Sequence, residues 1–184
     1  MQTISFDITE TERLFSEKRI MELRGLSNRL IREASLRNDY AKAELGVIAY
    51  ALHKMETKSH FVQSQQWNRI KQAILQHLHE GAEAARRENA QVLMDSLKQI
   101  IKNIRGIDDE LGNYAQNIYD KAKVKQASLA YSYGLSIAQS AALTGTDQKE
   151  LQSYIGFTTM PDEESEIKSI GERVKELRQL VGAE

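Results

Sequence analysis

Apolar residues recur at steps of three and four along most of this chain, a spacing typical of α-helices with one buried face. A first helix is predicted to begin at Thr9, because the Thr-x-x-Glu pattern of Thr9 and Glu12 is typical of a capping box. This helix is expected to continue past Gly25 along the apolar positions Ile20, Leu23, Leu26, Leu30 and Ile31. A second helix, capped by Asn38 or Asp39, is expected to bury Leu45, Ile48, Leu52 and Met55.

The middle of the chain continues the same pattern. A third helix is predicted from about Ser59 to an interruption at Gly81, and a fourth from about residue 82 to a stop at Gly106. Asp108 is expected to cap a fifth helix that reaches Gly134. The apolar faces of the third and fourth helices are Phe61, Trp67, Ile70, Ile74, Leu75 and Leu78, then Leu93, Leu97, Ile100 and Ile104.

Residues 136–158, SIAQSAALTGTDQKELQSYIGFT, have the spacing of a helix-turn-helix. Ala141 permits a close helix crossing, Gly145 makes the turn, and Leu151 anchors the second helix. Thr146 is expected to cap that helix. Since glutamine and lysine suit base edges and phosphates, the predicted nucleic-acid contacts of this unit are Thr146, Gln148, Lys149, Gln152 and Ser153. The alternative interpretation is a helical hairpin used only for packing, because Asp147 and Glu150 would also face the phosphates.

The last segment, residues 161–184, has apolar residues spaced three, four, three and four apart between charges of both signs. This heptad seam predicts an amphipathic helix that packs on the chain itself, on a second copy or on a partner. Its predicted partner-binding residues are Ile167, Ile170, Val174, Leu177 and Val181.

Composition supports an all-α protein, since 184 residues include one proline and ten glycines, too few turn residues for a β-rich fold. The expected organisation is an antiparallel helical bundle over residues 1–115, a helix-turn-helix-like unit over 116–160 packed on that bundle, and the amphipathic helix over 161–184. The chain has no cysteine, which excludes disulfides and thiolate metal sites. No nucleotide-binding glycine loop, nucleophile elbow or zinc-protease motif is present. We therefore expect no enzymatic activity, no cofactor and no metal.

The N-terminus lacks the pattern of a secretory signal, and the longest uncharged stretch, residues 126–146, contains too many serines, glutamines and threonines for a membrane span. A cytoplasmic protein without a membrane role is expected.

The formal net charge is −1, whereas proteins that hold nucleic acid through phosphates usually carry a positive excess. The acidic segment 161–184 has a net charge of −3 and the remainder +2. Two basic groups could supply phosphate contacts: Lys98, Lys102 and Arg105 on one helical face, and Lys121 with Lys125 on another. The alternative is that both are ordinary solvated flanks.

Three stretches, KAELGVIAYALHKM, SLAYSYGLSIAQSAALTGTDQKELQSYIGFT and MPDEE, resemble a group of archaeal helical proteins with a C-terminal helix-turn-helix-like segment that ends in a Tyr-Ile-Gly-x-Thr string, here residues 154–158. That group is similar to antitoxin or regulator partners of PIN-domain nucleases. The resemblance implies a nucleic-acid-binding regulator that also holds a protein partner.

Two functions from different classes follow. The first is a non-enzymatic regulator that binds duplex DNA through the helix-turn-helix and binds a protein partner, for instance a PIN-domain nuclease. The second is a helical interaction or scaffold subunit without a nucleic-acid role. Both predict a homo-oligomer or a protein partner.

Overall fold

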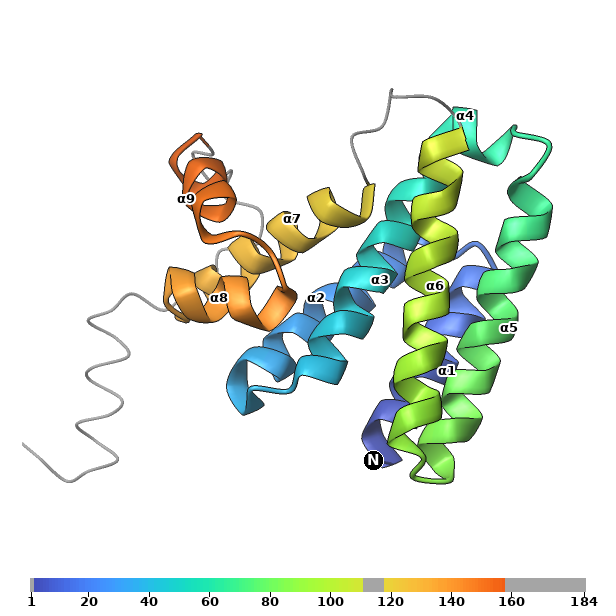
Figure 1. The fold of residues 1–184 in the computed structure, drawn as a ribbon, viewed down its shortest axis with the longest axis horizontal. Coiled ribbons are helices and arrows are strands. Elements are labelled where there is room, and N and C mark those ends of the chain that lie inside the picture. Colours follow the sequence, from blue (N-terminus) through green and yellow to red (C-terminus); the bar gives the residue numbers. More distant parts are fainter. Residues whose placement is uncertain (1, 111–117, 158–184) are drawn as a thin grey trace, which may run out of the picture.

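The computed structural model describes residues 2–110 and 118–157, and within these ranges all regular secondary structure is helical. This confirms the predicted all-α class. The helices are α1 (Gln2–Ser16), α2 (Ile20–Arg37), α3 (Tyr40–Glu56), α4 (Ser59–Val62), α5 (Trp67–Arg86), α6 (Ala90–Glu110), α7 (Ile118–Ser132), α8 (Ile137–Thr144) and α9 (Gln148–Phe157) (Figure 1).

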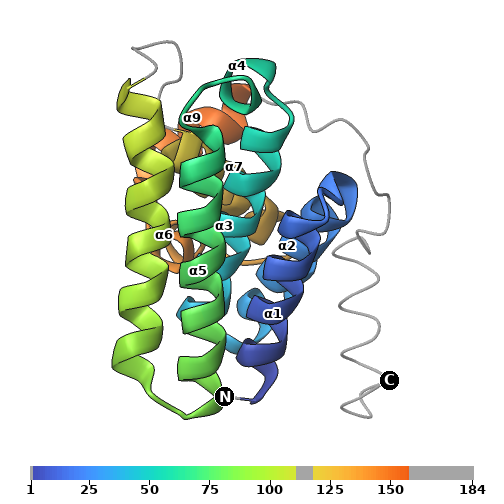
Figure 2. The ribbon, with the colours of Figure 1, turned by 90° about the vertical axis from the view of Figure 1, so that its right-hand side faces the viewer.

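Two antiparallel hairpins, α2–α3 and α5–α6, form most of the bundle, and α1 packs against α5 (Figure 2). Helix α3 lies at the centre, because it contacts α1, α2, α6, α7 and α8. Its sequence explains this position: AELGVIAYAL is apolar nearly all round, and a helix with no polar face is stable only when it is covered on every side. The largest fully buried side chains of the bundle include Phe15, Phe61, Leu45, Ile48, Leu52, Ile74 and Leu78.

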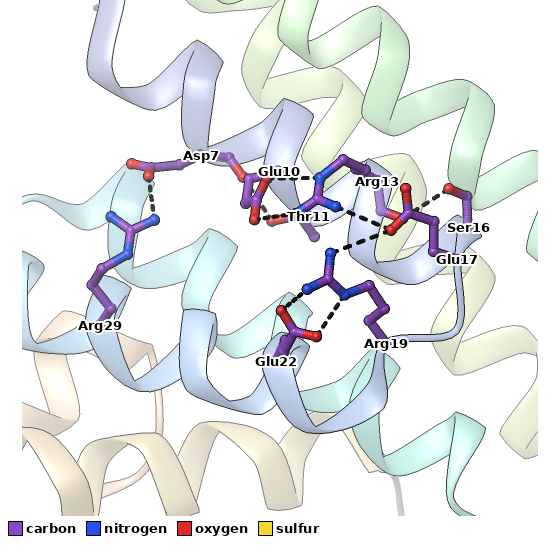
Figure 3. A network of polar contacts seen from close by, with 9 residues as sticks. All are labelled: Asp7, Glu10, Thr11, Arg13, Ser16, Glu17, Arg19, Glu22 and Arg29. Carbon is purple, nitrogen blue, oxygen red and sulfur yellow. Dashed lines mark hydrogen bonds and ion pairs between the residues drawn. The ribbon is translucent and has the colours of Figure 1, made fainter.

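Charged side chains tie α1 to its neighbours (Figure 3). Arg29 of α2 pairs with Asp7 of α1 at 2.9 Å, and the ammonium of Lys42 on α3 lies 3.1 Å from the other oxygen of Asp7. The side chains of Asp7 and Lys42 are each only 3% exposed. Glu33 completes the group by accepting a hydrogen bond of 2.6 Å from Lys42. A buried carboxylate is thus matched by cations from two other helices, as burial of a charge requires.

Several predicted helix ends are wrong. Helix α1 begins at Gln2, not Thr9, and the Thr9 and Thr11 hydroxyls donate to carbonyls one turn earlier inside the helix. The chain then breaks around Lys18, so that the predicted first helix is really α1 and α2. The predicted cap at Asp39 is correct, since its carboxylate accepts from the Lys42 backbone N–H at 3.0 Å.

Glycines do not end the helices where the sequence suggested. Gly81 lies inside α5, which continues to Arg86, and Gly106 lies inside α6, which continues to Glu110. The predicted third helix is divided instead into the short α4 and the long α5. These differences move ends and turns but leave the buried faces as predicted.

Helices α7, α8 and α9 form the part of the molecule that was predicted to be helix-turn-helix-like. Helix α7 packs on α2, α3 and α6, and its residues Ile118, Tyr119, Ala122 and Ala130 belong to the main core together with Leu143 of α8. The predicted boundary at 115/116 and the segment 161–184 lie outside the described residues. In the described ranges, none of the helices combines the length and the apolar character needed to cross a bilayer.

Candidate nucleic-acid interface

The α8–α9 turn is built by local signals that the sequence carries. The Ser136 hydroxyl accepts from the Gln139 backbone N–H, and the Gln139 side chain accepts from the Ser136 N–H, which is a complete capping box at the start of α8. At the other end Gly145 adopts the left-handed conformation, with φ of 67°, and the Thr146 N–H returns to the Ala141 carbonyl at 3.1 Å. The turn therefore falls at the glycine where it was predicted.

The predicted anchor residues meet in a small core of their own. Ala141 of α8 and Leu151 of α9 are buried against Ala127 of α7, and Ile137 and Ile155 pack around them. This cluster is separate from the main core of the bundle. The unit thus consists of three helices, with α7 as the support for the α8–α9 pair.

Two polar residues of α8, Ser140 and Thr144, occupy positions where apolar residues were expected, and both are buried. The Thr144 hydroxyl donates to the Ser140 carbonyl at 3.2 Å, so that this hydroxyl is satisfied within the helix. The Ser140 hydroxyl, in contrast, is buried without a hydrogen-bond partner within the described residues, so that only Thr144 is satisfied in the packed helix.

Asp147, not Thr146, caps α9. The Asp147 carboxylate accepts from the backbone N–H groups of Lys149 at 2.9 Å and Glu150 at 3.1 Å. The prediction that Thr146 is the cap is therefore wrong, and Thr146 is half-buried in the turn. A carboxylate at this position compensates the positive end of the helix, so Asp147 opposes an approaching phosphate less than its formal charge suggests.

Four of the predicted contact residues lie on the exposed surface of α9: Gln148, Lys149, Gln152 and Ser153. Glu150 is exposed there as well. Helix α9 packs on α7 and α8. A solvent-facing second helix is what the DNA-binding hypothesis requires, although α9 itself carries one lysine and one glutamate and therefore no excess positive charge.

The first predicted basic stripe lies beside this turn. Lys98, Lys102 and Arg105 of α6 line an open pocket of about 670 Å³ whose other walls include Tyr119, Lys123, Thr144 and Gly145. The fold thus places a stripe from α6 next to the α8–α9 turn, about 40 residues further along the chain.

Acidic side chains neutralise much of that stripe. Asp120 pairs with Arg105 at 3.1 Å and with Lys123 at 2.8 Å, and Asp95 lies 3.6 Å from Lys98. Lys102 has no ion pair within the described ranges. The stripe therefore attracts phosphates less strongly than its sequence suggests, because most of its cations have partners.

Tyr119 forms the inner wall of this pocket. Its hydroxyl donates to the Glu44 carboxylate, and burial, together with the negative charge of Glu44, raises the pKa of Tyr119 far above its usual range. Arg105 and Lys123 lie over the Tyr119 ring, 5.3 Å and 5.8 Å from its centroid. The Lys123 ammonium also donates to the Gly145 carbonyl at 3.1 Å and so ties the turn to α7.

The second predicted basic pair, Lys121 and Lys125, is exposed on α7. These residues are one turn apart and share a face. Tyr119, two positions before Lys121, is buried and lies under the ammonium of Lys123.

The structure adds a basic group that the sequence analysis missed, which we call the Lys54 cluster: Arg24 of α2, Lys54 of α3, Lys58 before α4, and Lys125 of α7. The Lys54 ammonium lies over the Tyr50 ring, 5.4 Å from its centroid. Burial lowers the pKa of Lys54, and the positive charges of Arg24, Lys125 and Lys58 lower it further. These cations are spread over 102 residues of sequence and form no motif. Only the spacing of four between Lys54 and Lys58 indicates a shared helical face.

The buried His53 lies next to this cluster. Its Nδ1 is 3.0 Å from the Ile20 carbonyl, and burial together with the charges of Lys54 and Arg24 lowers its pKa. Among the described residues, no group of three or more histidine or carboxylate side chains is arranged to hold a metal ion. The predicted partner-binding residues Ile167, Ile170, Val174, Leu177 and Val181 lie outside the described residues.

No protein-family model matches this sequence, and no curated protein or solved structure is similar enough to count as a match.

Proposed function

We propose that the chain is a non-enzymatic, antitoxin-like regulator that binds duplex DNA through α8 and α9 and binds a protein partner through another helical surface. The observation that carries this proposal is the separate core of Ala127, Ala141 and Leu151, which supports α9 with its polar face turned to solvent. In DNA-binding proteins of this shape, the second helix of the pair enters the major groove with its N-terminal residues at the base edges.

The positions of the charges support placing α9 in the groove. Cations lie near the α7–α8–α9 unit in two groups, the stripe along α6 and the Lys54 cluster. Helix α9 itself carries glutamines and a lysine, which suit base edges. Phosphate contacts beside a recognition helix position a protein on the duplex, and contacts from the helix select the sequence.

The test is binding of a labelled mixed-sequence duplex, followed by fluorescence anisotropy from about 50 mM salt upward. We expect affinity that falls steeply with salt, and weaker binding by the Lys149→Glu variant. The matched control is Arg87→Glu, since Arg87 is exposed at the α5–α6 turn, at the opposite end of the molecule from α9 (Figure 1). Absence of binding by the wild type at about 50 mM salt would refute the DNA-binding proposal.

A second function, a helical interaction subunit without a nucleic-acid role, is favoured by one apolar surface. Leu36 and Tyr40, at the α2–α3 turn, are 79% and 54% exposed. They line an open groove of about 790 Å³ whose apolar residues also include Leu135, Ala138 and Ala142 and whose polar residues include Arg37 and Gln139. Exposed apolar patches of this kind are typical of protein interfaces. A Leu36→Asp variant that leaves the molecular mass in solution and partner binding unchanged would exclude this surface.

A further inference from the structure

The Lys54 cluster is assembled by tertiary packing, since α2, α3 and α7 contact one another and each contributes a cation. Arg24, Lys54 and Lys58 are half-buried and Lys125 is exposed, so that the cluster is set into the surface with one open side. Half-buried cations lose less side-chain freedom on binding an anion than fully exposed ones do.

No carboxylate neutralises the three lysines. Within residues 2–110 and 118–157, Lys54, Lys58 and Lys125 form no ion pair. Burial lowers the pKa of Lys54, and the neighbouring charges of Arg24, Lys125 and Lys58, all positive, lower it further. This distinguishes the cluster from the α6 stripe, where Asp95 and Asp120 pair with Lys98 and Arg105. Repulsion among cations that fold together is relieved when an anion binds between them.

The cluster lies beside the helix-turn-helix unit. Lys125 belongs to α7, one turn from Lys121 and two positions before Ala127 of the small α7–α8–α9 core. Helix α7 also packs directly on α9, and the Tyr50 ring of α3 lies under the Lys54 ammonium. An anion bound at Lys125 would therefore lie close to the α7–α9 contact.

We propose that the Lys54 cluster binds a backbone phosphate of the duplex whose bases face α9. This inference rests on the proposed DNA-binding function and adds a phosphate contact on a second surface. A single duplex strand that passes α9 presents phosphates at regular intervals, and we expect Lys54, Lys58 and Lys125, which form no ion pair within the described residues, to hold one of them.

The experiment compares the salt dependence of duplex binding for three full-length proteins. They are the wild type, the cluster variant Lys54→Gln/Lys125→Gln, and the control variant Arg69→Gln/Arg87→Gln, which removes two exposed cations from α5 and the turn that follows it. The plot of log affinity against log salt is expected to lose about 1 unit of slope in the cluster variant, as one lost phosphate contact requires, and to stay unchanged in the control. At about 0.1 M salt, the cluster variant is expected to bind at least tenfold more weakly.

Each outcome decides a different point. If the wild type does not bind duplex DNA, both the proposed function and this inference fail. If the wild type binds and Lys149→Glu weakens binding, but the cluster variant keeps the wild-type slope and affinity, only this inference is overturned. Tighter binding by the cluster variant would also overturn it. Lys125→Gln alone, at an exposed position, gives the same comparison if the double variant does not fold.

Discussion

The crossing of α2 and α3 predicts opposite effects for two glycine-to-alanine substitutions. A Cβ placed on Gly46 of α3 would lie 3.0 Å from two side-chain carbons of Ile31 and 3.3 Å from the Cβ of Leu30. Both neighbours are fully buried, and the Ser27 hydroxyl donates to the Gly46 carbonyl at 2.7 Å across the same contact. A Cβ on Gly25 of α2 would meet no atom within 4 Å.

The magnitudes follow from two opposing effects. Replacing glycine by alanine in a helix interior raises the free energy of unfolding by about 1 kcal/mol, because alanine has the higher helix propensity. Overpacking of a tight core contact lowers the free energy of unfolding by about 1–3 kcal/mol. Gly25→Ala is therefore expected to raise the free energy of unfolding by about 1 kcal/mol, and Gly46→Ala to lower it by about 1 kcal/mol. For a chain of this size, the two variants should differ in Tm by about 4–8 °C.

Urea unfolding followed by circular dichroism at 222 nm measures both values under the same conditions. Each variant serves as the control for the other, because both gain the same helix propensity and only one gains a contact. If Gly46→Ala is stabilised as much as Gly25→Ala, α2 and α3 do not cross as closely as described.

Three further substitutions test the core, the small cluster and the buried histidine. Lys71→Met leaves the buried Glu56 carboxylate, 2.6 Å away, without its partner and should cost about 3 kcal/mol in urea unfolding, with part of that loss recovered in Lys71→Met/Glu56→Met. Leu151→Ala should cost about 2–3 kcal/mol and expose the amides of α9 to faster hydrogen exchange, while exchange in α5 remains unchanged. Burial lowers the pKa of His53, so the unfolded state binds a proton at higher pH than the folded state does, and the free energy of unfolding should fall as pH drops below about 6.5. The His53→Gln variant should lose less of its free energy of unfolding than the wild type does between pH 7.5 and 5.5.

The helices were predictable because their apolar faces follow local spacing, but the turns between them were not. The two turns that the sequence analysis misplaced are made by Lys18 and Glu88, both with φ of 56°, a left-handed conformation that long side chains seldom adopt. Gly25, Gly81 and Gly106, which resemble stop signals, lie inside helices. Tertiary packing overrides local preference at these positions, since the buried faces on either side leave the chain no other place to reverse.

The helix-turn-helix unit could be predicted because each of its determinants acts over a few residues. Ser136 and Gln139 cap one helix, Gly145 makes the turn, and the spacing of Ala141 and Leu151 brings their side chains together. The one local error, Thr146 in place of Asp147 as the cap of α9, exchanged adjacent residues of similar capping ability. Whether the unit contacts DNA is a separate question, because that depends on charges contributed by other helices.

The ion pairing of those charges could not be predicted from the sequence. A run such as Lys98, Lys102 and Arg105 is visible because helical spacing puts its members on one face, but the acids that neutralise it include Asp120 of another helix. Arg24, Lys54, Lys58 and Lys125 are scattered along the chain and come together only when α2, α3 and α7 pack. The strength with which a surface attracts phosphates depends on unpaired charge, and pairing is a property of tertiary structure. Local patterns therefore predicted the solvent-facing helix α9, whereas the grouping of Lys54, Lys58 and Lys125 depends on the way in which α3 and α7 pack.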